Sequence, residues 1–447
     1  MKKLFKSPSA IFLMFAFLFS STTYNVWKNW QNGNPFYSDV DQYYSYLVAA
    51  FVKNDLTFHF PNQYWLSSPK GIPVPKVSMG MAYMYTPFFA ISHFVAINSS
   101  EYPPDGYSKP YAYGMQWGSI IYGLLGLLFL RKLLLNFFDE WPTTLTLISV
   151  FMATNLFHYF LGWPLMPHSY LFFLFALLLH LVVRWHQNPQ MKTMMLIGFL
   201  IGLIAVIRPL DVLVALIPLL YGVYSKESFH QKIQLLKTNF LQLRIGFVFF
   251  WIPIIPQLIY WKWATGEFLY FSYGDSERFF FNDPQIVNFL FSYRKGWFVY
   301  TPIMVLAIIG FFQMKRFKDF SIAILVYTIL VIYLLSTWWC WWYGGGQGMR
   351  AMVQSYAILA IPLAAFYSYV FTNKFLKFIF VRLLVVFVYF NFLLTWQYKT
   401  NILHWDGVNK EVFWGVFGEW DRSNVPESVF EKVISPDYDK AKKGERD

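Results

Sequence analysis

Charged residues are scarce in this chain. Only 13% of its 447 residues are Asp, Glu, Lys or Arg, whereas 57% are hydrophobic and 22% are aromatic. A soluble domain has about 25% charged residues, so this composition excludes an ordinary soluble globular protein. The bilayer is the solvent that the composition predicts, and the fold class we expect is an all-α polytopic membrane protein.

Cysteine and nucleotide-binding signatures are also missing or nearly so. The single cysteine, Cys340, excludes an intrachain disulfide. The sequence contains no Walker loop, no dinucleotide fingerprint and no nucleophile elbow, and its histidines lack metal-ligand spacing. We therefore expect no nucleotide cofactor and no resident metal.

Long apolar runs, by contrast, recur along most of the chain. We expect about eleven membrane spans, because each run is long enough to cross roughly 30 Å of hydrocarbon. In order they are about 9–24, 113–131, 143–160, 168–184, 193–208, 210–224, 244–262, 298–313, 320–337, 351–372 and 376–395.

Lysine and arginine fall in alternate loops between these runs, which predicts the orientation of the chain. Short cytoplasmic loops retain positive charge. The basic clusters share one side if the N-terminus is cytoplasmic: Lys2, Lys3, Lys6, Arg131, Lys132, Arg184, Lys192, Lys226, Lys232, Lys237, Arg244, Lys315, Arg316, Lys318, Lys374, Lys377 and Arg382. The net charge of +12 is then mostly a consequence of topology and gives no reason to expect nucleic acid.

The remaining segments would lie on the outer face. We expect a transmembrane domain over residues 1–395, with a first external loop at 25–112, and a small external C-terminal tail at 396–447. Within the first loop, Asp41–Leu56 and Met79–Ile97 resemble helices that lie in the membrane interface. Loops this long usually carry function.

Two carboxylates follow the first span, in the string YSDVDQYY that ends at Tyr44. Asp39 or Asp41, beside Tyr43 and Tyr44, is our candidate for a general base that deprotonates an acceptor hydroxyl. The two acids could instead hold a divalent cation such as Mg²⁺ or Mn²⁺. In the simplest alternative, Asp39 only caps the helix that follows.

Basic residues at the outer ends of spans are candidates for binding a lipid phosphate. They are Arg208 in RPLD, and Arg294 and Lys295 in YRKGW. In the alternative interpretation Arg208 only pairs with Asp211 one turn away, and the other two side chains extend to the interface.

The most unusual string is WWCWWYGGGQGMR, from Trp338 to Arg350. Its aromatic half could hold a sugar ring, its glycines allow close approach of the backbone, and Gln347 and Arg350 can donate hydrogen bonds. The alternative is an interfacial aromatic belt. The substrate-binding candidates from this string are Trp338, Trp339, Trp342, Tyr343 and Gln347, to which we add His168, although a structural histidine is the ordinary interpretation.

Together these features resemble the GT-C superfamily of membrane glycosyltransferases, which includes protein O-mannosyltransferases and lipid A aminoarabinose transferases. The resemblance rests on the acids after the first span, the segment KVSMGMAYMYTP and the glycine-containing hairpin that ends at Arg208-Pro209. The strings DVDQYY, SYRKGWFVYTP and WWYGGGQGMR are similar to uncharacterised glycosyltransferases of Bacteroidetes-type bacteria. The motifs depart from those of the better-known families, which leaves donor, acceptor and the choice between Asp39 and Asp41 open.

The resemblance implies a GT-C-like bundle in the bacterial inner membrane, with a cytoplasmic N-terminus and a periplasmic C-terminus. The activity it implies is inverting transfer of a sugar from a polyprenyl-phosphate donor, a membrane lipid, to a lipid, glycan or protein acceptor. Arg208, Arg294, Lys295 and Arg350 would bind the donor phosphate. Two rival functions stay open: a transporter or flippase for lipid-linked glycans, although no internal repeat supports it, and a non-catalytic subunit of an envelope complex.

Overall fold

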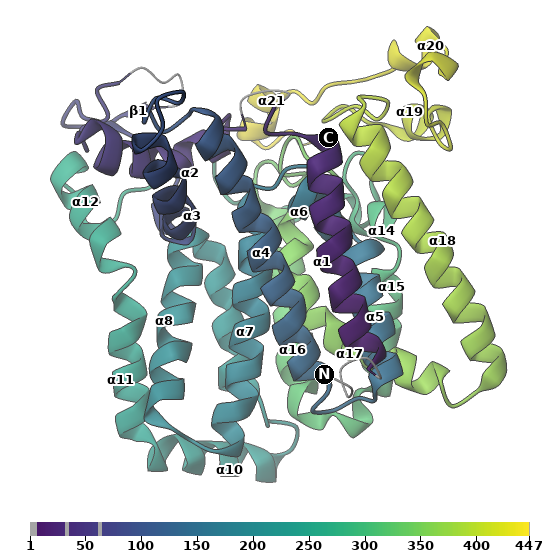
Figure 1. Ribbon diagram of the computed structural model, residues 1–447. Coiled ribbons are helices and arrows are strands. Elements are labelled where there is room, and N and C mark those ends of the chain that lie inside the picture. Colours follow the sequence, from purple (N-terminus) through teal and green to yellow (C-terminus); the bar gives the residue numbers. More distant parts are fainter. Residues whose placement is uncertain (1–6, 32–34, 61–64, 447) are drawn as a thin grey trace.

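The computed structural model describes residues 7–31, 35–60 and 65–446, and within this part the chain is almost entirely helical (Figure 1). Its only named strands are β1 (Leu66–Ser67) and β2 (Pro73–Val74), which form a short antiparallel pair. The all-α expectation is confirmed.

Seven helical segments of the described chain are long and apolar enough to cross a bilayer. They are α1 (Pro8–Trp27), α4 (Lys109–Leu134), α7 (Pro167–Gln187), α11 (Phe240–Trp251) with α12 (Ile255–Thr265), α16 (Lys318–Thr337), η5 (Arg350–Ser355) with α17 (Tyr356–Val370), and α18 (Lys374–Lys399). The chain is therefore a multi-pass membrane protein.

Shorter helices occupy the other four predicted spans. They are α5 (Glu140–Met152) with α6 (Leu156–Leu161), α8 (Met191–Ile207), η3 (Pro209–Ala215) with α9 (Leu216–Leu220), and α14 (Trp297–Tyr300) with α15 (Met304–Gly310) and η4 (Phe311–Arg316). Proline explains two of the interruptions, because Pro209 and Pro302 disfavour helical backbone in the residue before them. All eleven predicted ranges are thus helical, and the number of crossings stays a prediction.

Two helices within residues 25–112 match in range the pair that we expect in the membrane interface. They are α2 (Asp39–Val48), continued by the π-helix η2 (Ala49–Lys53), and α3 (Gly80–Ile97). Their place in the interface stays a prediction. At Gly80 a Cβ atom would lie 2.5 Å from the backbone nitrogen of Ile207, so only glycine lets α3 begin against the end of α8. This contact brings the start of α3 next to Arg208.

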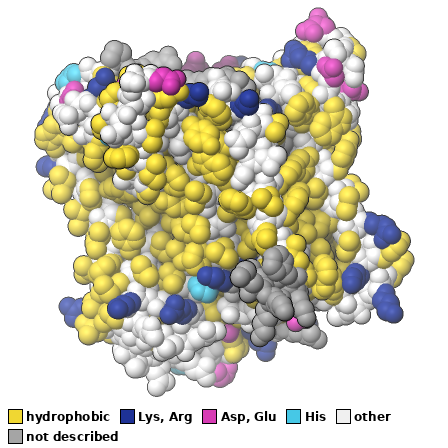
Figure 2. Space-filling model, viewed as in Figure 1, with side chains coloured by type: hydrophobic (Ala, Val, Ile, Leu, Met, Phe, Trp, Pro, Cys, Tyr) yellow, Lys and Arg dark blue, Asp and Glu magenta, His cyan; other side chains and the backbone are white. Residues whose placement is uncertain are grey.

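Figure 1 shows α2, α3 and the C-terminal segment at one end of the bundle and α10 (Lys226–Thr238) at the other. We call these the site end and the α10 end. Helix α1 starts at the α10 end, and a band of hydrophobic side chains separates the two ends (Figure 2). Lys2, Lys3 and Lys6 lie outside the described residues, and the orientation in the membrane stays a prediction.

The remaining elements belong mostly to the site end. Helix α13 (Ile286–Phe291) precedes α14, and the C-terminal segment contains α19 (Lys410–Gly415), η6 (Arg422–Asn424), α20 (Glu427–Phe430) and α21 (Tyr438–Lys443). This segment packs on the loop 338–350, as described below.

Glycine also sets the packing of α8 against α11. A Cβ atom on Gly198 would lie 1.9 Å from the carbonyl oxygen of Gly246, and one on Gly202 would lie 2.0 Å from that of Phe250. Glycines four residues apart let two membrane helices approach at backbone distance. This approach holds the end of α8, and with it Arg208, in place.

We expect Gly202→Leu to lower the thermal stability of the purified protein, because the new side chain must displace the backbone of α11. Overpacking of this kind costs about 1–3 kcal/mol. Leu196→Phe is the matched control, since it adds bulk on an exposed part of the same helix. Equal melting temperatures for the two variants would contradict the proposed packing.

Candidate functional site

The two predicted acids lie in the first turn of α2 but have different surroundings. The side chain of Asp39 is 41% exposed, whereas Asp41 is buried and accepts a hydrogen bond of 3.3 Å from the Tyr107 hydroxyl. Helical geometry explains the difference, because residues two apart point to different sides of a helix. This divergence is unfavourable for a cation shared by both carboxylates.

The capping interpretation of Asp39 is wrong. The N-cap position belongs to Ser38, which has a φ of 54°, and Asp39 is the first residue of α2. Its carboxylate is therefore free to face other segments.

Asp39 meets Arg350 across the site end. Its Oδ2 lies 3.7 Å from Nη2 of Arg350, whose side chain is only 16% exposed. The guanidinium also lies 5.9 Å from the ring centre of Trp163, which is stacked on Tyr37. The start of α2 and the loop 338–350 thus converge. The distance of 3.7 Å between Asp39 and Arg350 is longer than a tight charge-assisted hydrogen bond.

Glycines of the loop 338–350 place Arg350. Gly346 has a φ of 153°, and a Cβ atom there would lie 2.9 Å from the Tyr159 hydroxyl and 3.2 Å from Cδ of Arg350. At Gly348, with a φ of 59°, a Cβ atom would lie 2.7 Å from that of Tyr300. The loop therefore needs glycine for packing as well as for its backbone conformation.

Gln347, a predicted substrate-binding residue, is committed to the interior. It is 1% exposed, and its amide donates to Thr395 Oγ1 at 3.0 Å. Its carbonyl oxygen accepts from Asn155 at 2.8 Å. This residue anchors the loop, and a contact with substrate stays a prediction.

The tryptophans of the loop are largely covered by the C-terminal segment. Trp339 and Trp342 are 6% and 1% exposed, and both rings contact Tyr438. The buried Arg446 donates to the carbonyl oxygens of Thr337 and Trp338. The indoles of Trp339 and Trp342 therefore present no open face for a sugar.

The other aromatic candidates also have packing roles. Tyr343 donates to the Leu335 carbonyl oxygen, and Tyr44 donates to that of Gly106. Trp338 is half-buried, 5.6 Å from Tyr273 between ring centres. Trp338 thus contacts Tyr273, whose hydroxyl interacts electrostatically with Asp39.

Arg208 forms the pair with Asp211 that the alternative interpretation expected, at 3.9 Å. Asp211 also accepts two hydrogen bonds from the amide of Gln354, whose oxygen lies 3.4 Å from Nδ1 of His168. One guanidinium nitrogen of Arg208, Nη1, is buried without a partner among the described residues. Arg208 thus keeps a donor that a further acceptor can use.

Tyr43 and Tyr273 lie in the field of these charges. Burial raises the pKa of Tyr43, and the carboxylate of Asp39 adds to the rise. Burial also raises the pKa of Tyr273 to about 12. Arg208 and Arg350 oppose both shifts, so all five groups interact electrostatically at one place.

The two adjacent basic residues of the YRKGW string have different environments. Arg294 lies over the Trp342 ring, 5.1 Å from its centre. Lys295 is 1% exposed and donates to the carbonyl oxygens of Gly346 and Trp405. Lys295 therefore ties the glycine loop to the C-terminal segment, and a phosphate-binding role for either residue stays a prediction.

Sequence reasoning missed the residues that close the site on the side of the loop 266–285. Lys76 forms an ion pair of 2.7 Å with Glu277, and its ammonium lies 4.8 Å from the ring centre of Tyr273. Lys442 lies 3.8 Å from the same glutamate. The acid Glu277, within an aromatic stretch of the sequence, was the available signal for this contact. Its partners Lys76 and Lys442 are far away in the sequence.

Two solved structures share this architecture over 95% of the chain. Both are of the archaeal oligosaccharyltransferase from Archaeoglobus fulgidus: AglB in complex with an inhibitory peptide and a dolichol-phosphate (TM-score 0.50, 14% identity) and the apo form (TM-score 0.52, 13% identity). The chain therefore shares the fold of these oligosaccharyltransferases.

The match is one of fold and covers 59% and 60% of those two chains, so this chain spans less than two thirds of their length. No family model and no curated protein matches the sequence. Within this shared fold, Asp39 and Arg350 meet at the site end, and both interact electrostatically with Tyr43 and Tyr273, as Arg208 does.

We expect the stability of this protein to rise with pH between about 7 and about 10 through Lys295. Burial lowers the pKa of Lys295 to about 7, although Asp406 opposes the shift. In an unfolded chain the pKa of a lysine is about 10.4, so the folded state loses this proton first and gains stability as pH rises through the interval.

Thermal unfolding at pH 7 and pH 9.5 measures the effect. Lys295→Met should show a smaller rise than the parent protein, whereas Lys410→Met, at an exposed lysine, should match it. The same rise in all three proteins would refute the role of Lys295.

Proposed function

We propose that this chain is an integral-membrane glycosyltransferase that moves a sugar from a polyprenyl-phosphate donor to an acceptor. The single observation that carries the proposal is the Asp39–Arg350 pair, a base candidate beside a phosphate-binding candidate, within a GT-C-type fold. A transfer reaction needs a base and a group that binds the leaving phosphate within reach of one reacting centre.

Asp39 is the proposed general base. It is the more exposed of the two acids and faces Arg350, whereas Asp41 is held in the interior by Tyr107. Asp41 then positions α2 rather than reacting. The acceptor hydroxyl or amide would give its proton to Asp39.

Arg350 and Arg208 are the proposed phosphate ligands. Arg350 has a loose partner at 3.7 Å, and Arg208 has an unpartnered buried nitrogen. Guanidinium groups bind phosphate through paired donors and stabilise charge that develops on a leaving group. When the donor phosphate takes Arg350, the Asp39 carboxylate is released to act on the acceptor.

The proposed reaction inverts the anomeric centre. The acceptor oxygen or nitrogen forms a bond to the anomeric carbon as the bond from that carbon to the phosphate oxygen breaks. The proton goes to Asp39, and the electron pair leaves with the polyprenyl phosphate beside Arg350 and Arg208. Inversion requires the base and the leaving group on opposite faces of the sugar, so Asp39 and Arg350 separate when the donor binds.

The sugar needs a site next to Asp39 and Arg350, because 3.7 Å leaves no room for a ring between them. Tyr37 is 49% exposed and stacked on Trp163, beside Arg350, which makes it a better platform than the covered indoles of Trp339 and Trp342. Tyr43 and Tyr273 supply hydroxyl groups near Asp39. We assign the sugar contacts to these residues.

Location follows from the pattern of basic loops. With the α10 end cytoplasmic, the site end faces the periplasm of a bacterial inner membrane, where nucleotide sugars are not supplied. A lipid-linked donor meets that requirement. The oligosaccharyltransferase of similar fold was solved with a dolichol-phosphate and a peptide, which supports a polyprenyl-phosphate donor here, with a glycan, lipid or protein as acceptor.

We expect Asp39→Asn to lower sugar transfer by about 10²–10⁴-fold, the usual contribution of a general base, in a protein that still folds. The readout is the membrane glycoconjugate that disappears when the gene is deleted from its host, measured by mass spectrometry in replacement strains. Asp41→Asn is the matched control and should lower stability more than rate.

A stable Asp39→Asn protein that restores the glycoconjugate in full would exclude this base. It would leave the chain as a flippase or as a non-catalytic subunit.

Arg350→Gln should weaken binding of undecaprenyl phosphate to the purified protein by about 10- to 100-fold, because a hydrogen bond to a charged group contributes about 1.5–3 kcal/mol. Native mass spectrometry measures the bound lipid. Lys410→Gln, which removes one exposed positive charge at the site end, should bind as the parent does. Equal loss in both variants would point to a general charge effect.

A further inference from the structure

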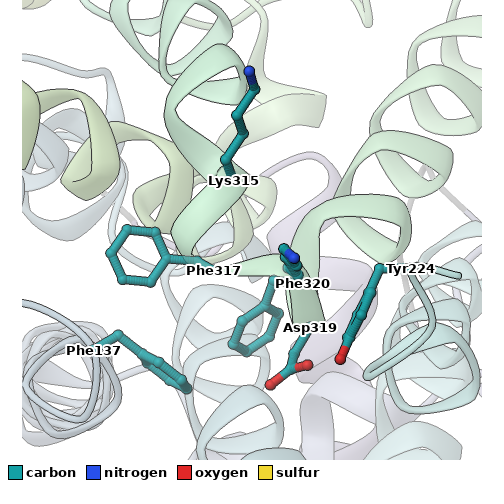
Figure 3. Close-up of a pocket in the computed structure, with 7 residues that line it drawn as sticks. Phe137, Tyr224, Lys315, Phe317, Asp319 and Phe320 are labelled. Carbon is teal, nitrogen blue, oxygen red and sulfur yellow. The ribbon is translucent and has the colours of Figure 1, made fainter. Parts of the chain in front are cut away.

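A pocket of about 310 Å³ lies at the α10 end, where three connections between helices meet (Figure 3). Phe137 comes from the connection between α4 and α5, and Tyr224 from that between α9 and α10. Its other lining residues are Lys315, Phe317, Lys318, Asp319 and Phe320. The mechanism proposed above uses none of them.

The pocket combines positive charge with aromatic walls. The Lys318 ammonium lies 5.6 Å from the ring centre of Tyr224, and Lys315 extends away from Asp319 in Figure 3. Phe137 packs edge-on against Phe320 with ring centres 5.7 Å apart. Phe137 and Phe320 therefore form a packed aromatic wall, and the side chains of Lys315 and Lys318 are both exposed.

Neither lysine is neutralised by the protein. The ion pairs between described residues involve neither Lys315 nor Lys318. The only acid in the lining, Asp319, stands in the first turn of α16, where a negative charge stabilises a helix. The helix therefore accounts for Asp319 without a ligand. Together the two lysines and Asp319 leave the lining with a net positive charge.

The backbone adds to this field. Helix α16 has 20 residues, and its first three, Lys318 to Phe320, all line the pocket. The N-terminus of a helix carries partial positive charge, which favours an anion. Of these three amides, that of Phe320 already donates to the carbonyl oxygen of Phe317. The two lysines and the N-terminus of α16 thus both favour the binding of an anion.

We propose that this pocket binds a phosphate group, carried by an anionic membrane lipid. The volume suits a headgroup, since ligand sites begin near 300 Å³. Basic pockets between membrane helices at the cytoplasmic side bind such headgroups. Phe312, 77% exposed on the neighbouring η4, offers apolar surface to an acyl chain, which favours a lipid over free phosphate.

Native mass spectrometry of the full chain with phosphatidylglycerol, and separately with phosphatidylcholine, tests the proposal. Lys315→Gln with Lys318→Gln should weaken phosphatidylglycerol binding by about 30-fold, from about fivefold for each lysine near the membrane surface, and leave phosphatidylcholine binding unchanged. Lys374→Gln with Lys377→Gln is the matched control, because it removes two exposed lysines from the start of α18.

A second arm replaces the lipid by inorganic phosphate and follows the melting temperature. Protection by phosphate that the lysine pair requires would support the site with a soluble source, whereas protection by lipid alone supports the lipid. If the double variant fails to fold, each single variant should show an intermediate loss.

Three results would overturn the proposal. They are equal weakening in the lysine variant and its control, no weakening in either, and loss of phosphatidylglycerol only in Arg350→Gln, which would move the lipid to the site end.

Discussion

The position of the Arg350 guanidinium is the constraint on which the candidate site depends. Gly346 has no side chain, so Tyr159 and the stem of Arg350 occupy the space beside its backbone. Lys295 donates hydrogen bonds to the carbonyl oxygens of Gly346 and Trp405. These contacts place the Arg350 guanidinium within reach of Asp39.

The C-terminal segment packs against this arrangement. Arg446 is buried and binds the start of the glycine loop, and Tyr438 contacts both Trp339 and Trp342 while donating to Asp406. Residues far from α2 in sequence therefore stabilise the loop that faces it. A domain boundary near residue 395 divides the sequence by composition, but the packing crosses it.

Local properties were predictable from the sequence, and long-range contacts were not. Hydropathy found a helix in each expected span because burial in lipid depends on the segment itself. The acids after the first span and the WWCWWYGGGQGMR string could likewise be identified from local sequence alone. By contrast, Arg294 and Lys295 are neighbours with opposite surroundings, and only the partners Trp342, Gly346 and Trp405 distinguish them. The covered indoles and the Lys76–Glu277 pair likewise depend on segments distant in sequence.

The loose pairing of Asp39 with Arg350 has a kinetic consequence for the proposed reaction. At 3.7 Å the arginine withholds the carboxylate from an acceptor that arrives first, and an arriving phosphate competes for the arginine and frees it. Substrates would then add in a compulsory order, donor before acceptor. An acceptor that meets the empty protein would find no available base, so it would be activated only after the donor is in place.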